Sequence, residues 1–273
     1  MIQYNVVSNT TYKSMANLED KKIVYYDDPL EDEFAEAKIE SKPIDEHYPY
    51  KYSAGRKILR VFTYRIVAIP LAYAYLKLYF GHKLVGREKL KGYKEGIYLY
   101  GNHTNAIADA LIPTMVTMPK GIFVIVNPDN VSMPVLGKLT PSLGAIPLPG
   151  NMKATKNFMK LLKDLADKGK NIMIYPEAHI WPYYTGIRPF KDDSFTYPVK
   201  YHKPVFCFTN TYVKWGKKKR PRIVTYVDGP FFADNKESVA TARGKLRDQV
   251  YGAMRENAKK NEVELVTYIQ REK

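Results

Sequence analysis

One strand-like run followed by a helix start constrains the fold most. Residues 96–100 are apolar and aromatic, as in a buried strand, and Gly101 ends the run. A helix is expected to begin at Asn105, a good N-cap residue, because residues 106–112 combine strong helix formers with an apolar face. The sequence therefore predicts a strand, a short loop and a helix in this order.

The loop and the first helical turn contain two groups suited to proton transfer. His103 lies in the loop and Asp109 lies just inside the helix. A histidine titrates near neutral pH, so it accepts a proton from an alcohol when one ring nitrogen is held and the other faces the substrate. We expect His103 to be a general base held by Asp109. From these residues alone the alternative stays equally open: a turn histidine, and an acid that complements the helix dipole.

A second block follows another buried strand-like run. Residues 171–175 are apolar or aromatic after Asn171, and Pro176 and Glu177 come directly after them. A carboxylate at the end of a central strand is well placed to hold a polar substrate. Farther along, Arg188 and Lys191 add positive charge.

The remaining pattern alternates strands with helices. Residues 153–168 and 238–260 have the spacing of amphipathic helices, and residues 205–213 and 223–227 resemble two strands of a hairpin. Such alternation predicts an α/β fold with a central, mostly parallel or mixed sheet flanked by helices.

Four ordered blocks resemble those of the glycerophospholipid acyltransferase family (PlsC-like, lysophosphatidic acid acyltransferase). They are the Asn-His block at 102–109, Gly144-Ala145-Ile146, the Pro-Glu block at 175–178, and Tyr197-Pro198-Val199, which the resemblance identifies as a proline-centred strand. They follow the family's order at plausible spacing within residues 84–230. Four ordered blocks are far more specific than any one of them.

The resemblance implies an enzyme that moves a fatty acyl group from acyl-CoA or acyl carrier protein to the hydroxyl of a lysophospholipid or glycerol phosphate. His103 is then the base, Asp109 its partner, and no cofactor or metal is expected. Backbone amides of residues 144–146 are candidates for stabilising the oxyanion, and cationic side chains for binding phosphate. The expected substrate-binding residues are Asn102, Asn105, Gly144, Ile146, Glu177, Arg188 and Lys191, with Lys153 and Lys156 as further phosphate candidates.

Three departures from the family pattern stand out. Five residues, rather than the usual four, separate His103 from Asp109. Residues 147–150 lack the arginine that often binds phosphate there, which leaves Arg188 as the nearest strong candidate, and Ala178 replaces a glycine.

Charge divides the chain unevenly. Residues 1–50 contain 11 acidic residues and 5 lysines, which gives them a net charge of −6. Since the whole chain has a net charge of +15, residues 51–273 have a net charge of +21. We expect residues 1–50 to be an acidic arm, either wrapped onto the basic body or solvated as a tail.

Three regions are expected along the chain, the arm being the first. Residues 51–83 mix aromatic, aliphatic and basic side chains, but their longest uncharged run, 66–76, is 11 residues and too short to span a bilayer. This composition favours a helical segment lying in a membrane interface, with a core-packed helix as the alternative. Residues 84–273 are then the α/β acyltransferase domain.

The basic stretch 214–222 contains Trp215 and is expected at the tip of the hairpin. Such a tip contacts anionic headgroups, binds nucleic-acid phosphates nonspecifically, or is an ordinary solvated loop. We expect an anionic membrane surface as the partner, no specific nucleic acid, and a peripheral or monotopic location on the cytoplasmic face of the cell membrane. The single cysteine, Cys207, excludes an intrachain disulfide and fits a buried strand.

Two other classes of function compete with acyl transfer. A metal-dependent hydrolase would use His103, Asp109, Glu177 and His179, although no familiar zinc spacing is present. A noncatalytic basic protein that binds membranes or nucleic acid would explain the net charge of +15 but not the ordered His, Asp and Glu blocks.

Overall fold

A mixed sheet with helices on both faces forms the body of the protein. The computed structural model describes residues 21–35, 40–50, 55, 61, 63–134 and 136–272. Within them, seven strands pair in the order β2-β8-β7-β3-β6-β4-β5. The strands are β2 (Lys83–Val85), β3 (Tyr98–Gly101), β4 (Phe123–Val126), β5 (Ala145–Pro147), β6 (Ile172–Ile174), β7 (Val205–Val213) and β8 (Arg222–Phe231).

Strand direction divides the sheet into two parts. Strands β3, β4, β5, β6 and β7 run parallel. Strand β8 is antiparallel to β7 and β2 is parallel to β8, so these two strands run the opposite way. The expected mixed sheet flanked by helices and the β7–β8 hairpin are confirmed.

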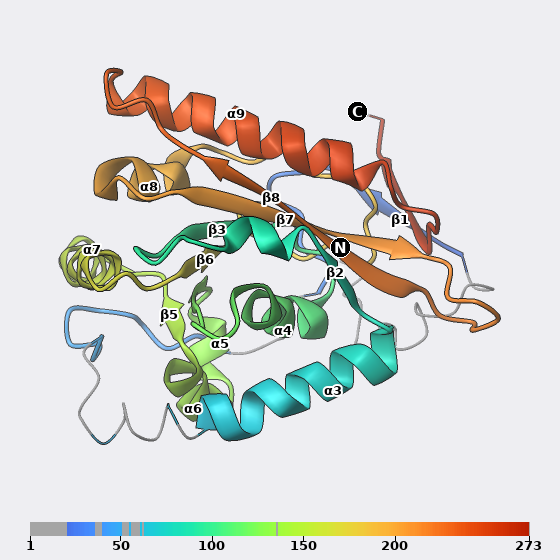
Figure 1. Ribbon diagram of the computed structural model, residues 1–273, viewed down its shortest axis with the longest axis horizontal. Helices are drawn as coiled ribbons and strands as arrows, with labels where there is room; N and C mark the ends of the chain where they lie inside the picture. Colours follow the sequence, from blue (N-terminus) through green and yellow to red (C-terminus); the bar gives the residue numbers. More distant parts are fainter. Residues whose placement is uncertain are drawn as a thin grey trace.

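The helices cover the two faces of the sheet (Figure 1). Described helices and helical turns are Thr63–Ala68 (a π-helical turn), α3 (Ile69–Phe80), Arg87–Leu90 (3₁₀), α4 (Ala106–Thr117), α5 (Asp129–Ser132), α6 (Leu136–Leu143), α7 (Met152–Asp167), Asp193–Phe195 (3₁₀), α8 (Thr196–Tyr201) and α9 (Val239–Ala258). Helices α3 and α4 share one apolar core with the sheet, and α7, α8 and α9 share the other. Figure 1 shows α8 and α9 above the sheet and α3 and α4 below it.

Strand β3 is the centre of both cores because its side chains alternate between the two faces. Tyr98 and Tyr100 pack with α7, α8 and α9, whereas Ile97 and Leu99 pack with α3 and α4. A run that is apolar on both faces is typical of a central strand in a parallel sheet. The end of β3 is therefore a rigid position from which a loop can project.

Helix caps fall where the sequence predicts or close to it. Asn105 caps α4 by accepting a hydrogen bond from the Ala108 N–H at 3.0 Å. Asn151 caps α7 in the same way, and Gly169, with a φ of 60°, follows its end.

One predicted strand is wrong. Residues 196–201, which contain Tyr197-Pro198-Val199, form the short helix α8. Pro198 is tolerated there because it lies in the first helical turn, where backbone N–H groups have no partner within the helix. The strand of this region is β7, which begins directly after Pro204.

The tip of the β7–β8 hairpin folds against the end of α3. A Cβ added to Gly81, which ends α3 with a φ of 55°, would lie 2.7 Å from the Trp215 ring. Arg220 stacks on Tyr79 of α3, with its guanidinium carbon 4.3 Å from the ring centroid. The basic tip and α3 therefore form one continuous surface.

The described part of the segment predicted to lie in a membrane interface is mostly helical, and Lys83 at its end begins β2. Its helical part includes the π-helical turn 63–68 and α3, and residues 51–54, 56–60 and 62 lie outside the described residues. None of the helices found in the described ranges is both long and apolar enough to cross a bilayer.

Part of the acidic arm lies along the body. Strand β1 (Lys22–Tyr26) pairs in parallel with β9 (Val266–Gln270) in a separate two-stranded sheet. Ile44 and Tyr50 are buried in the core that α7 shares. The arm at 1–20 and 36–39 lies outside the described residues.

Residues 26–34 of this arm hold the segment that follows β6. Both carboxylate oxygens of Glu33 accept the Ile180 N–H at 3.1 Å, and His179 lies 3.3 Å from the same carboxylate. The Trp181 indole donates to the Asp32 carbonyl at 2.7 Å. Burial raises the pKa of Glu33, but the hydrogen bonds from His179, Ala35 and Ile180 outweigh it, so the pKa lies below its usual value.

Glu33→Gln is expected to destabilise the protein by about 1 to 3 kcal/mol at neutral pH, as for a lost hydrogen-bonded charge. Since the folded-state pKa of Glu33 is lowered, its contribution is present above the unfolded pKa, near 4.5, and is lost as pH falls through the folded value. Urea unfolding at several pH values measures both effects. Glu31→Gln is the control, because the Glu31 side chain is exposed and its ion pair with Lys191, at 4.0 Å, is a weak surface contact. Equal stability of wild type and Glu33→Gln at neutral pH would contradict this role.

Candidate active site

The predicted histidine loop projects from the carboxyl end of β3. Gly101, the last residue of β3, is required because a Cβ there would lie 2.4 Å from the Phe208 ring. The loop runs from 102 to 105, and α4 begins at Ala106. Two backbone hydrogen bonds hold it: Trp181 N–H donates to the His103 carbonyl at 3.1 Å and Tyr183 N–H to the Thr104 carbonyl at 2.9 Å. A side-chain contact adds to them, because the Tyr212 hydroxyl lies 2.9 Å from that of Thr104.

His103 and Asp109 are in contact. The His103 Nδ1 lies 2.9 Å from Asp109 Oδ2. The five-residue spacing is accommodated because the Asp109 side chain reaches back over the first turn, where Oδ2 also accepts the N–H groups of Thr104 and Asn105, each at 2.8 Å. This resembles a capping box, in which a side chain inside the helix binds backbone N–H groups before it.

The hydrogen bonds fix the chemical state of the pair. Asp109 accepts two backbone N–H groups on Oδ2 and the Asn210 amide on Oδ1, at 3.0 Å, the arrangement in which a carboxylate acts only as acceptor. Nδ1 of His103 must then donate, so Nε2 is the basic nitrogen. Nε2 has no hydrogen-bond partner among the described residues, and the side chain is 17% exposed. The ring also stacks on Tyr175, with centroids 4.2 Å apart.

Glu177 supports this loop from the neighbouring strand β6. Its carboxylate accepts the His103 N–H and the Arg188 N–H, each at 2.9 Å, and the Arg188 guanidinium lies 3.7 Å away. Burial raises the pKa of Glu177, while Arg188 and the two backbone donors act in the opposite direction. The carboxylate thus joins the histidine loop to the segment after β6.

Arg188 and Glu177 are not placed as the sequence reasoning expected. Arg188 is 1% exposed and donates to the carbonyls of Pro29 and His179, besides facing Glu177. It also lies over the Trp181 ring, 4.9 Å from the centroid. With no surface for a phosphate, Arg188 is an internal anchor in this arrangement. Lys191 is exposed, with the Glu31 carboxylate 4.0 Å away.

The Gly144–Ile146 block lies too far from His103 to supply oxyanion donors. Ala145 pairs with Val124, Val124 with Met173 and Met173 with Leu99, so β5 lies three strands from β3, about 14 Å at the usual spacing. Gly144 also lies at the amino end of β5 and donates its N–H to the Pro141 carbonyl. Ile146 is buried in the core. These two positions belong to the edge of the sheet and to the core.

Asn102 and Asn105 are buried and have internal partners. The Asn102 side chain donates to the Asn210 carbonyl at 3.0 Å and accepts the Asn210 N–H at 2.7 Å, which ties the loop to β7. Asn105 is the N-cap of α4. Both shape the loop, and neither presents its side chain at the surface.

Asn210 is the residue of the site that sequence reasoning missed. It lies in β7 next to β3 and binds both Asp109 and Asn102. A signal was present: Thr209-Asn210-Thr211 interrupts an otherwise apolar strand. Buried polar side chains need partners, so three in succession mark a polar network. Cys207, in the same strand, is fully buried as expected, and burial raises the pKa of its thiol.

The four groups of the hydrolase alternative do not gather. Glu177 binds the histidine loop and Arg188, whereas His179 pairs with Glu33 of the arm. In the part of the chain that the structure describes, no three His, Cys, Asp or Glu side chains are arranged to hold a metal ion.

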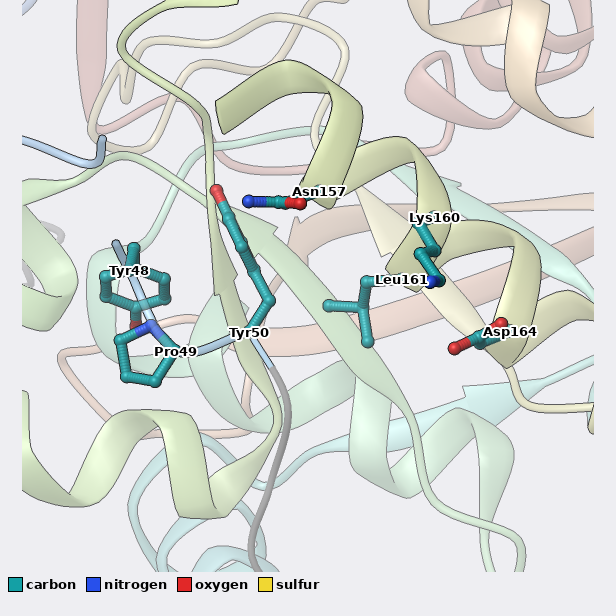
Figure 2. A pocket seen from close by; sticks show the side chains of 7 residues that line it. All are labelled: Tyr48, Pro49, Tyr50, Asn157, Lys160, Leu161 and Asp164. Atoms are coloured by element: carbon teal, nitrogen blue, oxygen red, sulfur yellow. The ribbon is translucent and has the colours of Figure 1, made fainter. Parts of the chain in front are cut away.

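Two surface hollows lie away from His103. One, of about 260 Å³, is formed by Tyr48, Pro49 and Tyr50 of the arm against α7 (Figure 2). The other, of about 540 Å³, lies where β3 and β6 begin, with Ile97 and Asn171 in its wall. His103 follows the opposite end of β3 from the second hollow, and no residue of the His103 loop lines the first, so both are separate from the site.

Comparison with known proteins agrees with the motif blocks. Residues 82–209 match the family model described as Acyltransferase. No curated protein sequence matches the chain. The fold is similar to the crystal structure of the 1-acyl-sn-glycerophosphate (LPA) acyltransferase PlsC from Thermotoga maritima, with 16% identity and a TM-score of 0.54 over 79% of this chain and 88% of that chain. At this identity the structural likeness shows a shared fold, and the family model supports the resemblance drawn from the four blocks.

Proposed function

We propose that this chain, a member of the acyltransferase family over residues 82–209, transfers a fatty acyl group from a thioester donor to the hydroxyl of a lysophospholipid or glycerol phosphate. The observation that carries the proposal is the His103 ring, which is held at Nδ1 by Asp109 and is open at Nε2. The PlsC of similar fold, described as an LPA acyltransferase, supports this class of acceptor.

The chemistry follows from this geometry. Nε2 takes the proton of the acceptor hydroxyl while its oxygen attacks the thioester carbonyl, and Asp109 stabilises the imidazolium that forms. The tetrahedral intermediate collapses with cleavage of the carbon–sulfur bond. The departing thiolate then receives the proton from His103, which restores the base. No enzyme nucleophile is needed, because the thioester is already activated.

Exposed lysines at the edge that carries His103 suit the charged parts of both substrates. Lys153 and Lys156 lie in the first turns of α7, which begins after the carboxyl end of β5, and Lys153 is 77% exposed. The N-terminus of a helix also attracts anions, because it carries a partial positive charge and free backbone N–H groups. We propose that this region and Lys191 bind phosphate groups of the substrates, with acyl-CoA or acyl carrier protein as donor.

The surface of α3 and the hairpin tip suits an anionic membrane. Apolar side chains of the helical segment are exposed, among them Ile66, Leu71 and Leu78, the last at 75%. The neighbouring tip presents Lys217 and Lys218 to solvent. Apolar insertion together with a basic patch gives reversible binding to anionic lipid, which places a peripheral enzyme next to its acceptor.

His103→Ala is expected to lower kcat by about 10² to 10⁴, because the base is lost. Acyl transfer is measured with palmitoyl-CoA and with palmitoyl-acyl carrier protein as donors and with lysophosphatidate and glycerol 3-phosphate as acceptors. His47→Ala is the control, since His47 is exposed in the arm. Thermal unfolding checks that both variants fold. Turnover near that of wild type in folded His103→Ala would rule out this base.

Vesicles of equal parts phosphatidylcholine and phosphatidylglycerol are expected to retain the protein at low salt and to release it as salt rises. Replacing Lys217 and Lys218 together with glutamine should weaken retention, since each basic residue near such a surface contributes about 1 kcal/mol. The matched control replaces Lys168 and Lys236, which are exposed elsewhere. Failure of wild type to sediment with these vesicles would contradict the membrane proposal.

A further inference from the structure

A buried row of side chains leads from Asp109 across the sheet to His82. Asn210 of β7 donates to Asp109 Oδ1 at 3.0 Å, Thr225 of β8 donates to Asn210 Oδ1 at 2.7 Å, and His82 Nε2 lies 2.8 Å from the Thr225 hydroxyl. Asn210 and Thr225 are direct partners in the β7–β8 ladder, and His82 immediately precedes β2, which pairs with β8. Asp109, Asn210, Thr225 and His82 are all buried.

The backbone N–H groups that bind Asp109 determine the direction of every hydrogen bond in this row. Two peptide N–H groups, which can only donate, bind Asp109 Oδ2, so the carboxylate acts as acceptor. The side of Asn210 that faces Asp109 must then be its NH₂, and the other side its oxygen. That oxygen accepts the only proton of the Thr225 hydroxyl. His82 Nε2 must therefore carry a proton and donate it to Thr225.

His82 is suited to be a permanent neutral donor. Burial and the nearby charge of Lys77 lower the pKa of His82 to about 4, so its ring is uncharged at neutral pH. The Lys77 ammonium binds the His82 carbonyl at 2.9 Å.

We propose that Asn210 and Thr225 are positioning residues for the catalytic pair, in a one-way chain of hydrogen bonds from His82 through Thr225 and Asn210 to Asp109. The chain keeps Asp109 an acceptor and holds it in the rotamer that contacts His103. Bonds in such a chain polarise one another, and reversing one of them requires reversing all. The proposal rests on the proposed role of His103 and Asp109. It extends the site to Asn210, Thr225 and His82, which contact no substrate.

Changing Asp109 should reverse the direction of every hydrogen bond in the chain, which gives a test that does not depend on enzyme turnover. In Asp109→Asn, the oxygen of the new amide stays with the backbone N–H groups, and its NH₂ faces Asn210. Asn210 must then turn its oxygen toward residue 109 and its NH₂ toward Thr225, whose hydroxyl donates to an unprotonated His82 Nε2. Imidazole ¹⁵N NMR of the full-length protein is expected to show His82 as the Nε2–H tautomer in wild type and as the Nδ1–H tautomer in Asp109→Asn. An unchanged His82 tautomer would overturn the chain whether or not the protein transfers acyl groups.

Kinetics test the positioning role with a matched pair of threonines. Thr225→Val breaks the middle of the chain and is expected to lower kcat about tenfold, the effect of one net hydrogen bond, while KM for acceptor and donor stays unchanged. Thr225→Ser, which keeps the hydroxyl, should restore the rate. Thr211→Val is the control, because the equally buried Thr211 donates to the Val224 carbonyl outside the chain.

The two readouts distinguish the possible failures. Equal loss of kcat in Thr225→Val and Thr211→Val, or no loss in Thr225→Val, would overturn the positioning role. If the wild type shows no acyl transfer but His82 changes tautomer in Asp109→Asn, the chain stands and the proposed function fails. Urea unfolding of each variant confirms that comparisons are made on folded protein.

Discussion

The Asp109 carboxylate is the interaction on which the site depends. It joins three elements that are distant in sequence: the loop after β3, the first turn of α4 and the middle of β7. Each carboxylate oxygen has its own donors, so the side chain is held from both sides. His103 is the one donor of this set that also faces outward, which makes it the reactive member of a pair whose other member is fixed.

A second carboxylate, that of Glu177, holds the main chain of His103, whereas Asp109 holds the His103 side chain. It binds the His103 N–H, and through Arg188 and the segment after β6 it is linked to the N-terminal arm. Two buried acids, one in α4 and one in the segment after β6, therefore hold one imidazole in place. A loop held by a rigid sheet on both sides keeps the base in position before substrate arrives, which reduces the entropy lost on reaching the transition state.

The sequence predicts what depends on local pattern and misses what depends on the packing between strands. Residues 96–112 contain a strand, a break and a cap, and each lies where its residues favour it. Arg188 was expected to bind phosphate because of its charge, but its burial under the arm depends on contacts with Pro29 and His179, which no local pattern contains. Gly144 was expected near His103 from motif order, yet strand order separates them. Asn210 was missed because a strand pattern records burial, not the hydrogen-bond partner across the sheet.

The most direct test of this account is the steady-state rate of Asp109→Asn with palmitoyl-CoA and lysophosphatidate. The substitution keeps the size of the side chain and an oxygen that faces Nδ1, but it removes the charge that stabilises the imidazolium. The account predicts that kcat falls by about 10² or more while the protein stays folded and KM for both substrates changes little. A rate within a few fold of wild type in folded Asp109→Asn would contradict it.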